Sequence, residues 1–318
     1  MRSSLKPAAG LTCLFALAVT GCSSGSTTAY APYVSATTAY ATDSAGSPSA
    51  YNLAFVISGG GGCTPKWNGT HPIGDASVKS RIARLKASRA KVRVSFGGAS
   101  GKELAAACGS VSTLAAAYGA ALDAAGSDLA DFDIEGDRLT DAASVALRSR
   151  AIAALQKARP DLEVSFTLPV MPSGLDSGGL ALLRSANEYD VQVSTVNLMT
   201  MNYGESYTGD MGDYAVTSAE AAHAQLKKVF GLSDAAAWQD MALTSMIGVN
   251  DIAGETFTLS DAARVRSFAE KKRIAWVSMW SAFRDRSCQA GESSGGDAAT
   301  ECSGVAQSAG AFGKAFAG

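Results

Sequence analysis

Four acidic side chains stand at fixed spacing in one short stretch of the sequence. Residues 128–136 read Asp-Leu-Ala-Asp-Phe-Asp-Ile-Glu-Gly, so carboxylates alternate with apolar side chains. This alternation is the period-two pattern of a strand, and it places Asp131, Asp133 and Glu135 on one face. Three carboxylates on one face repel one another and lose hydration, which folding alone does not favour. The stretch therefore indicates a site of acid–base chemistry.

The rest of the sequence alternates strand-like and helix-like segments. Eight apolar stretches predict strands, at residues 33–36, 53–57, 92–96, 129–134, 163–168, 193–199, 243–247 and 274–279. Alanine-rich stretches between them predict helices, at residues 78–88, 111–125, 142–158, 179–187, 218–230 and 260–272. This rhythm, unbroken by a Pro-rich linker, predicts an α/β fold, a single (β/α)8 TIM barrel. Catalytic residues of such barrels follow the carboxyl ends of strands, where Glu135 stands.

The spacing Asp-x-x-Asp-x-Asp-x-Glu, formed by Asp128, Asp131, Asp133 and Glu135, resembles the signature of the family-18 glycoside hydrolases, the chitinases and their relatives. The family carries it on the fourth strand, and the acidic strand is fourth here. The resemblance implies that Glu135 is general acid and then general base, while Asp133 holds the substrate's acetamido group. Asp131 would share a proton with Asp133. Asp128 is out of phase with the others, so we expect a structural hydrogen-bonding role for it.

Other strand ends carry further family-like residues. Ser95, Gly97 and Gly98 end the third strand and resemble the family's Ser-x-Gly-Gly element. These glycines would let the backbone approach the fourth strand closely. Trp280, at the end of the eighth strand, matches the tryptophan on which the cleaved sugar lies, so we expect it to stack beneath that sugar.

The sixth strand ends in Met-Thr-Met-Asn-Tyr-Gly, where the family usually shows a Met-x-Tyr-Asp-like run. In the direct alignment, Met201 takes the tyrosine position, Asn202 takes the aspartate position, and Tyr203 follows. We expect Tyr203 and Asn202 to orient the acetamido group. Met199 and Met201 would contact the substrate or pack in the barrel core.

The resemblance implies a glycosidase that cleaves β-1,4 linkages of N-acetylglucosamine polymers, such as chitin, with retention. In this substrate-assisted mechanism, the acetamido oxygen attacks the anomeric carbon and water then opens the oxazolinium ion. Two alternatives stay open: an endo-β-N-acetylglucosaminidase acting on N-linked glycans, and a non-catalytic surface glycan-binding protein. Binding-only relatives typically lose the terminal Glu, so the presence of Glu135 favours an enzyme. No cofactor is expected.

The segment between the seventh and eighth strands is short. Processive or chain-end-specific relatives often carry an α+β domain there, which forms one wall of a deep groove. Here residues 260–272 supply the one helix needed to link the strands, with Ser260 as the expected N-cap before Asp261. The remaining residues, 252–259, are too few for a wall. We therefore expect a barrel without this insertion, an open cleft and endo-type attack.

The first residues have the features of an export signal. Arg2 and Lys6 precede an uncharged apolar run at 11–19, which is too short to span a bilayer as a helix. The run ends in Val-Thr-Gly-Cys, which resembles the bacterial lipobox with Cys22 as the lipidated residue. We expect a signal peptide over 1–21, a flexible tether over 22–29 and the catalytic domain over 30–318. The protein would be lipid-anchored on the outer face of the bacterial cell membrane, or secreted.

Composition argues against other function classes. The chain of 318 residues has a formal net charge of −2, so no basic field indicates nucleic-acid binding. We also expect a monomer. Its two histidines, His71 and His223, give poor support to a multi-histidine metal site or a Ser-His-Asp triad. The acidic strand could hold Mg²⁺ or Ca²⁺, but the resemblance makes that the weaker use of these carboxylates.

Four cysteines remain after the predicted leader, and an even number in an oxidising compartment indicates two disulfides. The sequence alone allows three pairings. Cys63 and Cys108 follow neighbouring strands of the predicted barrel, whereas Cys288 and Cys302 bracket one loop after the eighth strand. We therefore favour Cys63–Cys108 and Cys288–Cys302, each bracing a loop near the cleft.

Overall fold

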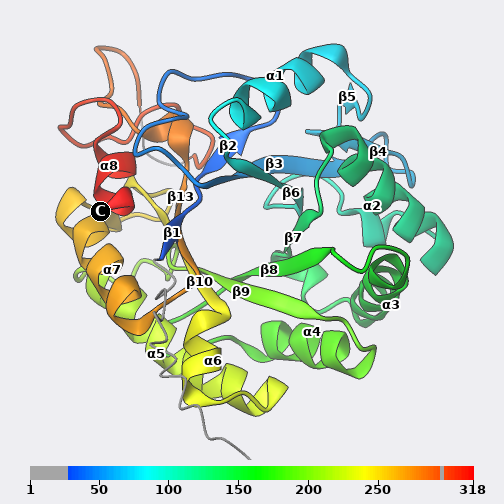
Figure 1. Ribbon diagram of the computed structural model, residues 1–318. Coiled ribbons are helices and arrows are strands. Elements are labelled where there is room, and N and C mark those ends of the chain that lie inside the picture. The colour runs from blue at the N-terminus through cyan, green and yellow to red at the C-terminus, as the bar shows by residue number, and fades with distance from the viewer. Residues whose placement is uncertain (1–27, 294–296) are drawn as a thin grey trace, which may run out of the picture.

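A computed structural model describes residues 28–293 and 297–318 of the chain. Figure 1 shows a ring of strands inside a ring of helices. The predicted signal peptide, Cys22 and most of the predicted tether lie outside the described residues. Within the described part of the chain, no helix is both long enough and apolar enough to cross a membrane.

Seven continuous strands and one divided strand close the barrel. The seven, each parallel to the barrel strands on either side of it, are β3 (Ala50–Ser58), β6 (Lys91–Gly97), β7 (Leu129–Asp133), β8 (Glu163–Pro169), β9 (Val193–Met199), β10 (Met241–Met246) and β13 (Trp276–Trp280). The divided strand begins the described chain: β1 (Ala29–Tyr30) pairs with β13, and β2 (Tyr33–Ser35) pairs with β3. One segment therefore joins the two edges of the sheet, and the predicted (β/α)8 barrel is confirmed.

The helices cover the outside of the barrel (Figure 1). They are α1 (Ala76–Lys86), α2 (Val111–Ala125), α3 (Ala142–Ala158), α4 (Ser177–Glu188), α5 (Met211–Phe230), α6 (Asp234–Gln239), α7 (Leu259–Lys272) and α8 (Ala311–Ala317). All six predicted helices are present, but α5 begins earlier than predicted because the Asp210 side chain caps it by accepting from the Asp213 N–H at 2.7 Å. The short helices α6 and α8 were not predicted.

The N-cap of α7 differs from the prediction. Thr258, rather than Ser260, caps the helix: its hydroxyl accepts from the Asp261 N–H, while the Asp261 carboxylate accepts from the Thr258 N–H. This reciprocal pair is a capping box. It forms because Thr258 has an extended backbone, so Ser260 already lies in the first turn.

Short antiparallel strands extend the barrel at the carboxyl ends of β3 and β10. After β3 come β4 (Pro65–Trp67) and β5 (His71–Pro72), and after β10 come β11 (Gly248–Val249) and β12 (Thr256–Phe257). Between β10 and β13 the chain forms only β11, β12 and α7. The predicted absence of an α+β domain at this point is therefore confirmed.

The acidic strand β7 has the two faces that its pattern predicts. Phe132 points outward, where its ring packs on Phe96 at 5.3 Å, on Tyr118 of α2 at 5.0 Å and on Phe166 at 5.7 Å between centroids. Asp131, on the opposite face, is buried inside the barrel. Apolar packing against the helices thus fixes the strand that carries the carboxylates.

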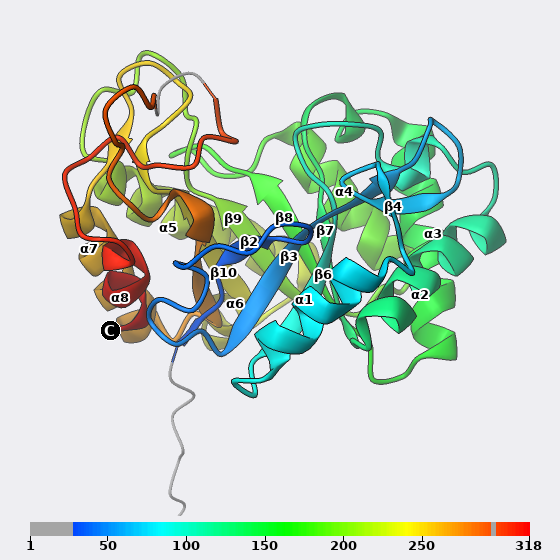
Figure 2. The same ribbon diagram turned by 90° about the horizontal axis from the view of Figure 1, so that it is seen from above.

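Both predicted disulfides are present. Cys63–Cys108 joins the loop after β3 to the loop after β6, with a Cα–Cα distance of 4.5 Å. Cys288–Cys302 closes the loop after β13, with a Cα–Cα distance of 5.0 Å. In Figure 2 the loops that follow the strands lie together along one side of the molecule. The disulfides therefore brace the side of the barrel at which the strands end.

Candidate active site

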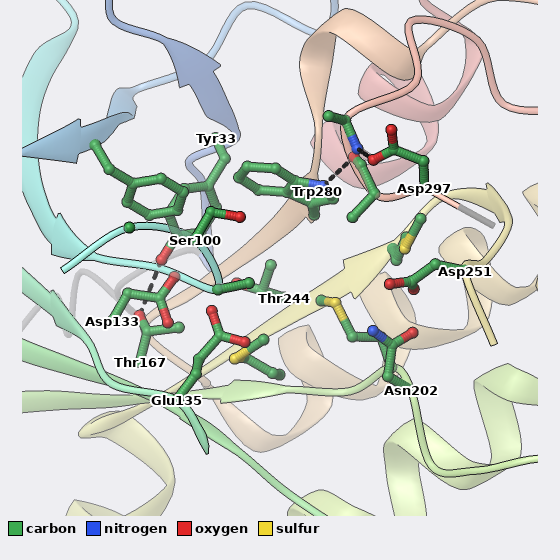
Figure 3. Close-up of a pocket in the computed structure, with 18 of the residues that line it drawn as sticks. Tyr33, Ser100, Asp133, Glu135, Thr167, Asn202, Thr244, Asp251, Trp280 and Asp297 are labelled. Atoms are coloured by element: carbon green, nitrogen blue, oxygen red, sulfur yellow. Dashed lines mark hydrogen bonds between the residues drawn. The ribbon is translucent and has the colours of Figure 1, made fainter. Parts of the chain in front are cut away.

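A cavity of about 460 Å³ opens at the carboxyl ends of the barrel strands. The labelled side chains in Figure 3 face it from opposite sides. It is lined by six of the residues that the sequence singled out: Asp133, Glu135, Met199, Met201, Asn202 and Trp280. Carboxylates, an amide and an indole around one cavity match the groups that hold sugar hydroxyls and sugar faces.

Asp131 lies beneath this cavity and accepts four hydrogen bonds from hydroxyl groups. Tyr33 and Ser95 donate to its Oδ2 at 2.9 and 2.7 Å, and Ser165 and Thr167 donate to its Oδ1 at 2.8 Å each. Strand register explains the serines, because Asp131 pairs with Ser95 on β6 and Ser165 on β8. The carboxylate is therefore held rigidly by four different donors.

The hydrogen-bonded network continues around and below Asp131. The Asn197 amide donates to Thr167 Oγ1 at 2.9 Å and accepts from the Thr244 hydroxyl at 2.9 Å. Nearer the base of the barrel, the Arg93 guanidinium donates to Asn52 Oδ1 at 2.7 Å. Burial lowers the pKa of Arg93, while the negative charge of Asp131 acts in the opposite direction. The barrel interior under the cavity is thus polar and internally paired.

Asp133 stands one step nearer the cavity. Its side chain is buried, with the residue only 5% exposed, and its Oδ1 has no hydrogen-bond partner among the described residues. Burial raises the pKa of Asp133 well above its usual range, and the charges of Glu135 and Asp131 raise it further. No hydrogen bond joins Asp133 to Asp131 in the described structure. The proton shared between them, which the family resemblance implies, therefore stays a prediction.

Glu135 lies two residues beyond the end of β7 and faces the cavity (Figure 3). Burial raises its pKa to about 7, and the negative charge of Asp251 contributes to the rise. A carboxyl group with this pKa suits proton donation followed by proton uptake near neutral pH. The raised pKa of Glu135 at the cavity, next to the buried Asp133, therefore supports acid–base chemistry.

Comparison with known proteins agrees with this site. No protein-family model matches the chain. It is 34% identical over 275 residues to the probable bifunctional chitinase/lysozyme of Escherichia coli K12, covering 80% of this chain and 31% of that protein. It is 33% identical over 248 residues to endochitinase 11 of Metarhizium anisopliae, covering 74% and 47%. The chain thus spans about a third and about half of the length of these two curated relatives.

Solved structures agree as well. The catalytic domain of a hyperthermophilic chitinase from Pyrococcus furiosus matches with a TM-score of 0.79 and 29% identity, over 90% of this chain and 93% of that one. Solved GH18 chitinases share the fold. The acidic motif stands at the carboxyl end of the fourth barrel strand, as the family places it. The chain belongs to glycoside hydrolase family 18.

The two glycines of the family-18 element bring β6 close to β7. Gly97 has a φ of 104°, and a Cβ there would lie 2.0 Å from the Asp133 carbonyl oxygen. The Gly98 N–H donates to that same oxygen at 2.9 Å. Only glycine fits at position 97, and the predicted close approach is confirmed.

Trp280 lines the cavity and is braced on three sides. Its indole N–H donates to the Ala298 carbonyl at 2.7 Å. Its ring stacks on Phe55 at 5.6 Å between centroids and lies 5.8 Å from the Tyr33 ring. The tryptophan of this family-18 site is therefore a fixed platform. Phe55, which shares the cavity wall, was missed in the sequence.

The prediction for Tyr203 is wrong. Its side chain does not line the cavity; the residue is 4% exposed, and its ring packs on Tyr207 and Tyr214. The reason is local: Asn202 has a left-handed φ of 56°, and Glu255 accepts from the N–H groups of Asn202 and Gly204 at 2.8 and 2.9 Å. These two hydrogen bonds fix the loop so that the Tyr203 side chain points into the core, while Asn202 stays at the cavity.

The role predicted for Asp128 is also wrong. The residue is exposed at the opposite end of the barrel, and within the described part of the chain its carboxylate makes no hydrogen bond. Only its backbone carbonyl is engaged, by the Glu163 N–H at 2.9 Å. Because Asp128 precedes β7, its side chain lies outside the barrel interior.

Several residues of the site were not predicted from the sequence. Those that reach the cavity or its network are Tyr33, Phe55, Ser165, Thr167, Asn197, Thr244, Asp251 and Asp297. Polar residues at every second position of apolar strands, as in Ser165 and Thr167, carried a usable signal. Asp251 carried none, because its place depends on the short β11–β12 pair.

Proposed function

We propose that this family-18 domain hydrolyses β-1,4 linkages between N-acetylglucosamine units of chitin and chitooligosaccharides. The observation that carries the proposal is the pair Asp133 and Glu135, which face one cavity beside Trp280. The names of the relatives, a chitinase/lysozyme and an endochitinase, support the same substrate class.

The chemistry proposed is retaining and substrate-assisted. Glu135 donates its proton to the glycosidic oxygen as the bond to the anomeric carbon breaks, and the substrate's acetamido oxygen forms the new bond to that carbon. The unpaired Oδ1 of Asp133 accepts from the acetamido N–H, which aligns the acetamido oxygen for attack. Water then adds to the anomeric carbon, Glu135 takes a proton from it, and the acetamido group is restored.

The attack is proposed to be endo-type. The wall beyond β10 consists of β11, β12 and their connection, so the cleft lacks the extra domain that encloses a chain end. A flexible chain can then bind at internal bonds. Hydrolysis of a soluble chitin derivative should lower the viscosity before reducing ends accumulate in proportion. Early release of dimers at nearly constant viscosity would contradict the endo mode.

The decisive experiment compares wild type with Glu135→Gln on N-acetylglucosamine hexamers. We expect the variant to bind the hexamer but to lose about 10²–10⁴-fold in turnover, because the positioned acid is removed. Glu205→Gln is a matched control, since Glu205 is exposed on the loop after β9 and does not line the cavity. Near-wild-type turnover by Glu135→Gln would refute the mechanism.

The same assay separates the alternatives. A glycoprotein with N-linked glycans, supplied in parallel, tests an endo-β-N-acetylglucosaminidase, and binding without hydrolysis of either substrate would indicate a glycan-binding protein. A chitosan without any N-acetyl groups should not be cut, because it lacks the nucleophile. Cleavage of that polymer would exclude substrate assistance.

A further inference from the structure

Glu255 is a buried carboxylate that the proposed hydrolysis does not use. It lies on the connection between β11 and β12, the residue is 1% exposed, and it does not line the cavity. In the described part of the chain, no Lys, Arg or His forms an ion pair with it. Because a buried charge without a counter-ion is unfavourable, folding alone does not favour a carboxylate at this position.

Both oxygens of Glu255 accept hydrogen bonds from the loop that follows β9. Its Oε2 accepts from the Asn202 N–H at 2.8 Å, and its Oε1 accepts from the Gly204 N–H at 2.9 Å. Burial raises the pKa of Glu255, and these N–H groups act in the opposite direction because they favour the charged form. The carboxylate therefore fixes the backbone on both sides of Tyr203.

The backbone fixed in this way decides which side chain reaches the cavity. Asn202 has a left-handed φ of 56°, a region that is uncommon for residues other than glycine. Its side chain lies at the cavity near Asp251 (Figure 3), whereas Tyr203 lies in the core. Within the part of the chain that the structure describes, the Asn202 amide makes no hydrogen bond, so its donor and its acceptor are both available to a ligand.

The hairpin that carries Glu255 is itself held in place. The Asn250 N–H donates to the Glu255 carbonyl at 3.1 Å, and the Asn250 amide donates to the Gly248 carbonyl at 3.0 Å. From the other side, Arg284 Nη2 donates to the Val249 carbonyl at 2.7 Å. Glu255 is thus mounted on a fixed support and couples the end of β10 to the loop after β9.

We propose that Glu255 is a positioning residue of this glycosidase, which holds the Asn202 amide at the cavity for contact with the bound sugar chain. The inference rests on the proposed function, in which the cavity holds N-acetylglucosamine units. Glu255 touches no substrate itself and acts through the backbone of Asn202. A contact prepared before the substrate arrives avoids the cost of ordering the loop during binding.

The first test measures binding of the N-acetylglucosamine hexamer by calorimetry in Glu135→Gln, so that no turnover is needed. Adding Glu255→Gln should weaken the affinity about fivefold, because the new amide nitrogen cannot accept and one loop N–H loses its acceptor. Molecules that fail to fold lower the stoichiometry and leave the affinity unchanged, so a general loss of structure does not produce this result. A loss below about twofold overturns the positioning role.

A double-mutant cycle with Asn202→Gly tests whether Glu255 acts through Asn202. Glycine adopts a positive φ without strain, so this substitution removes the amide and keeps the path of the backbone. Asn202→Gly alone should weaken hexamer binding about fivefold, and Glu255→Gln should then add less than about twofold. A full second loss would show that Glu255 acts independently of Asn202, which overturns the proposal.

Asp285→Asn is the matched control. Asp285 is also a buried carboxylate outside the cavity lining, and it accepts from the N–H groups of Phe312 and Gly313 at 3.0 and 2.8 Å. Its substitution should lower the midpoint of urea unfolding, as Glu255→Gln does, but change hexamer affinity by less than about twofold. An equal loss of affinity in this control would assign the effect to general destabilisation and overturn the proposal.

Turnover of the hexamer, measured in parallel, separates this inference from the proposed function. If the wild type cleaves the hexamer and Glu255→Gln keeps kcat/KM within about twofold, the positioning role fails and the hydrolysis stands. If the wild type binds the hexamer without cleaving it and the calorimetric losses are seen, the hydrolysis fails and the positioning role stands. No binding to Glu135→Gln overturns the positioning role, whatever the turnover.

Discussion

Replacing Asp131 with Asn should destabilise the barrel measurably. Asn keeps the shape, but its Nδ2 cannot accept hydrogen bonds, so two of the four hydroxyl donors lose their acceptor. Each buried group left unsatisfied costs about 1–3 kcal/mol. Tyr33 keeps a second contact, with Thr167 Oγ1 at 2.9 Å, so we expect a loss of about 2–4 kcal/mol in the free energy of unfolding. The buried Arg93 also loses a stabilising negative charge nearby.

Urea unfolding with both disulfides intact measures this loss as a lower midpoint at an unchanged slope. Ser165→Ala is the control, because it removes one donor and leaves the carboxylate with three, at a cost of about 1 kcal/mol. If Asp131→Asn costs no more than Ser165→Ala, the four-donor network does not stabilise the fold as argued. The variant should also lower the pKa of Asp133, since one of the charges that raise it is gone.

Three further outcomes follow from the geometry. The basic limb of the pH–kcat/KM profile should lie near pH 7, because activity falls as the acid Glu135 ionises, and Asp251→Asn should move it to lower pH. Gly97→Ala should lower the free energy of unfolding, measured in urea, by several kcal/mol, because the new Cβ would clash with the Asp133 carbonyl oxygen. A decrease below about 1 kcal/mol would contradict the close approach argued from Gly97. Replacing Cys288 and Cys302 by Ser opens a loop with a sequence separation of 14, which should lower the free energy of unfolding by about 3 kcal/mol. The replacement should also raise KM more than it lowers kcat, and an unchanged KM would show that the loop does not support the cavity.

The features that could be predicted from the sequence are those set by local pattern. The alternation in residues 128–136 predicted the strand, its two faces and the two carboxylates that face the cavity, because side-chain direction in a strand depends on spacing alone. The Cys63–Cys108 disulfide was predictable because cysteines that follow neighbouring parallel strands meet at one end of the barrel, and Cys288–Cys302 was predictable because its cysteines bracket one loop. The six longer helices were predictable from composition, whereas the short helices α6 and α8 and the cap at Thr258, which depends on a particular backbone, were not.

The features that could not be predicted depend on contacts between distant segments. Tyr203 stands where the motif suggests a substrate contact, but Glu255, far along the chain, fixes the loop and turns the phenol inward. Asp251 reaches the cavity only because of the short β11–β12 pair. Tyr33 reads as an ordinary strand residue, and its hydrogen bond to Asp131 spans 98 positions of sequence. Contacts between residues so far apart in the sequence produce no local sequence pattern from which they could be predicted.

The divided first strand also sets the direction in which the catalytic side would face on a cell. The chain enters the barrel at β1, at the end opposite to the loops that surround the cavity (Figure 2). An anchor at Cys22, as proposed from the sequence, would therefore attach to the base of the barrel. The cavity would then point away from the membrane, toward polymer arriving from outside, and the few residues between Cys22 and β1 would limit how far the site can reach.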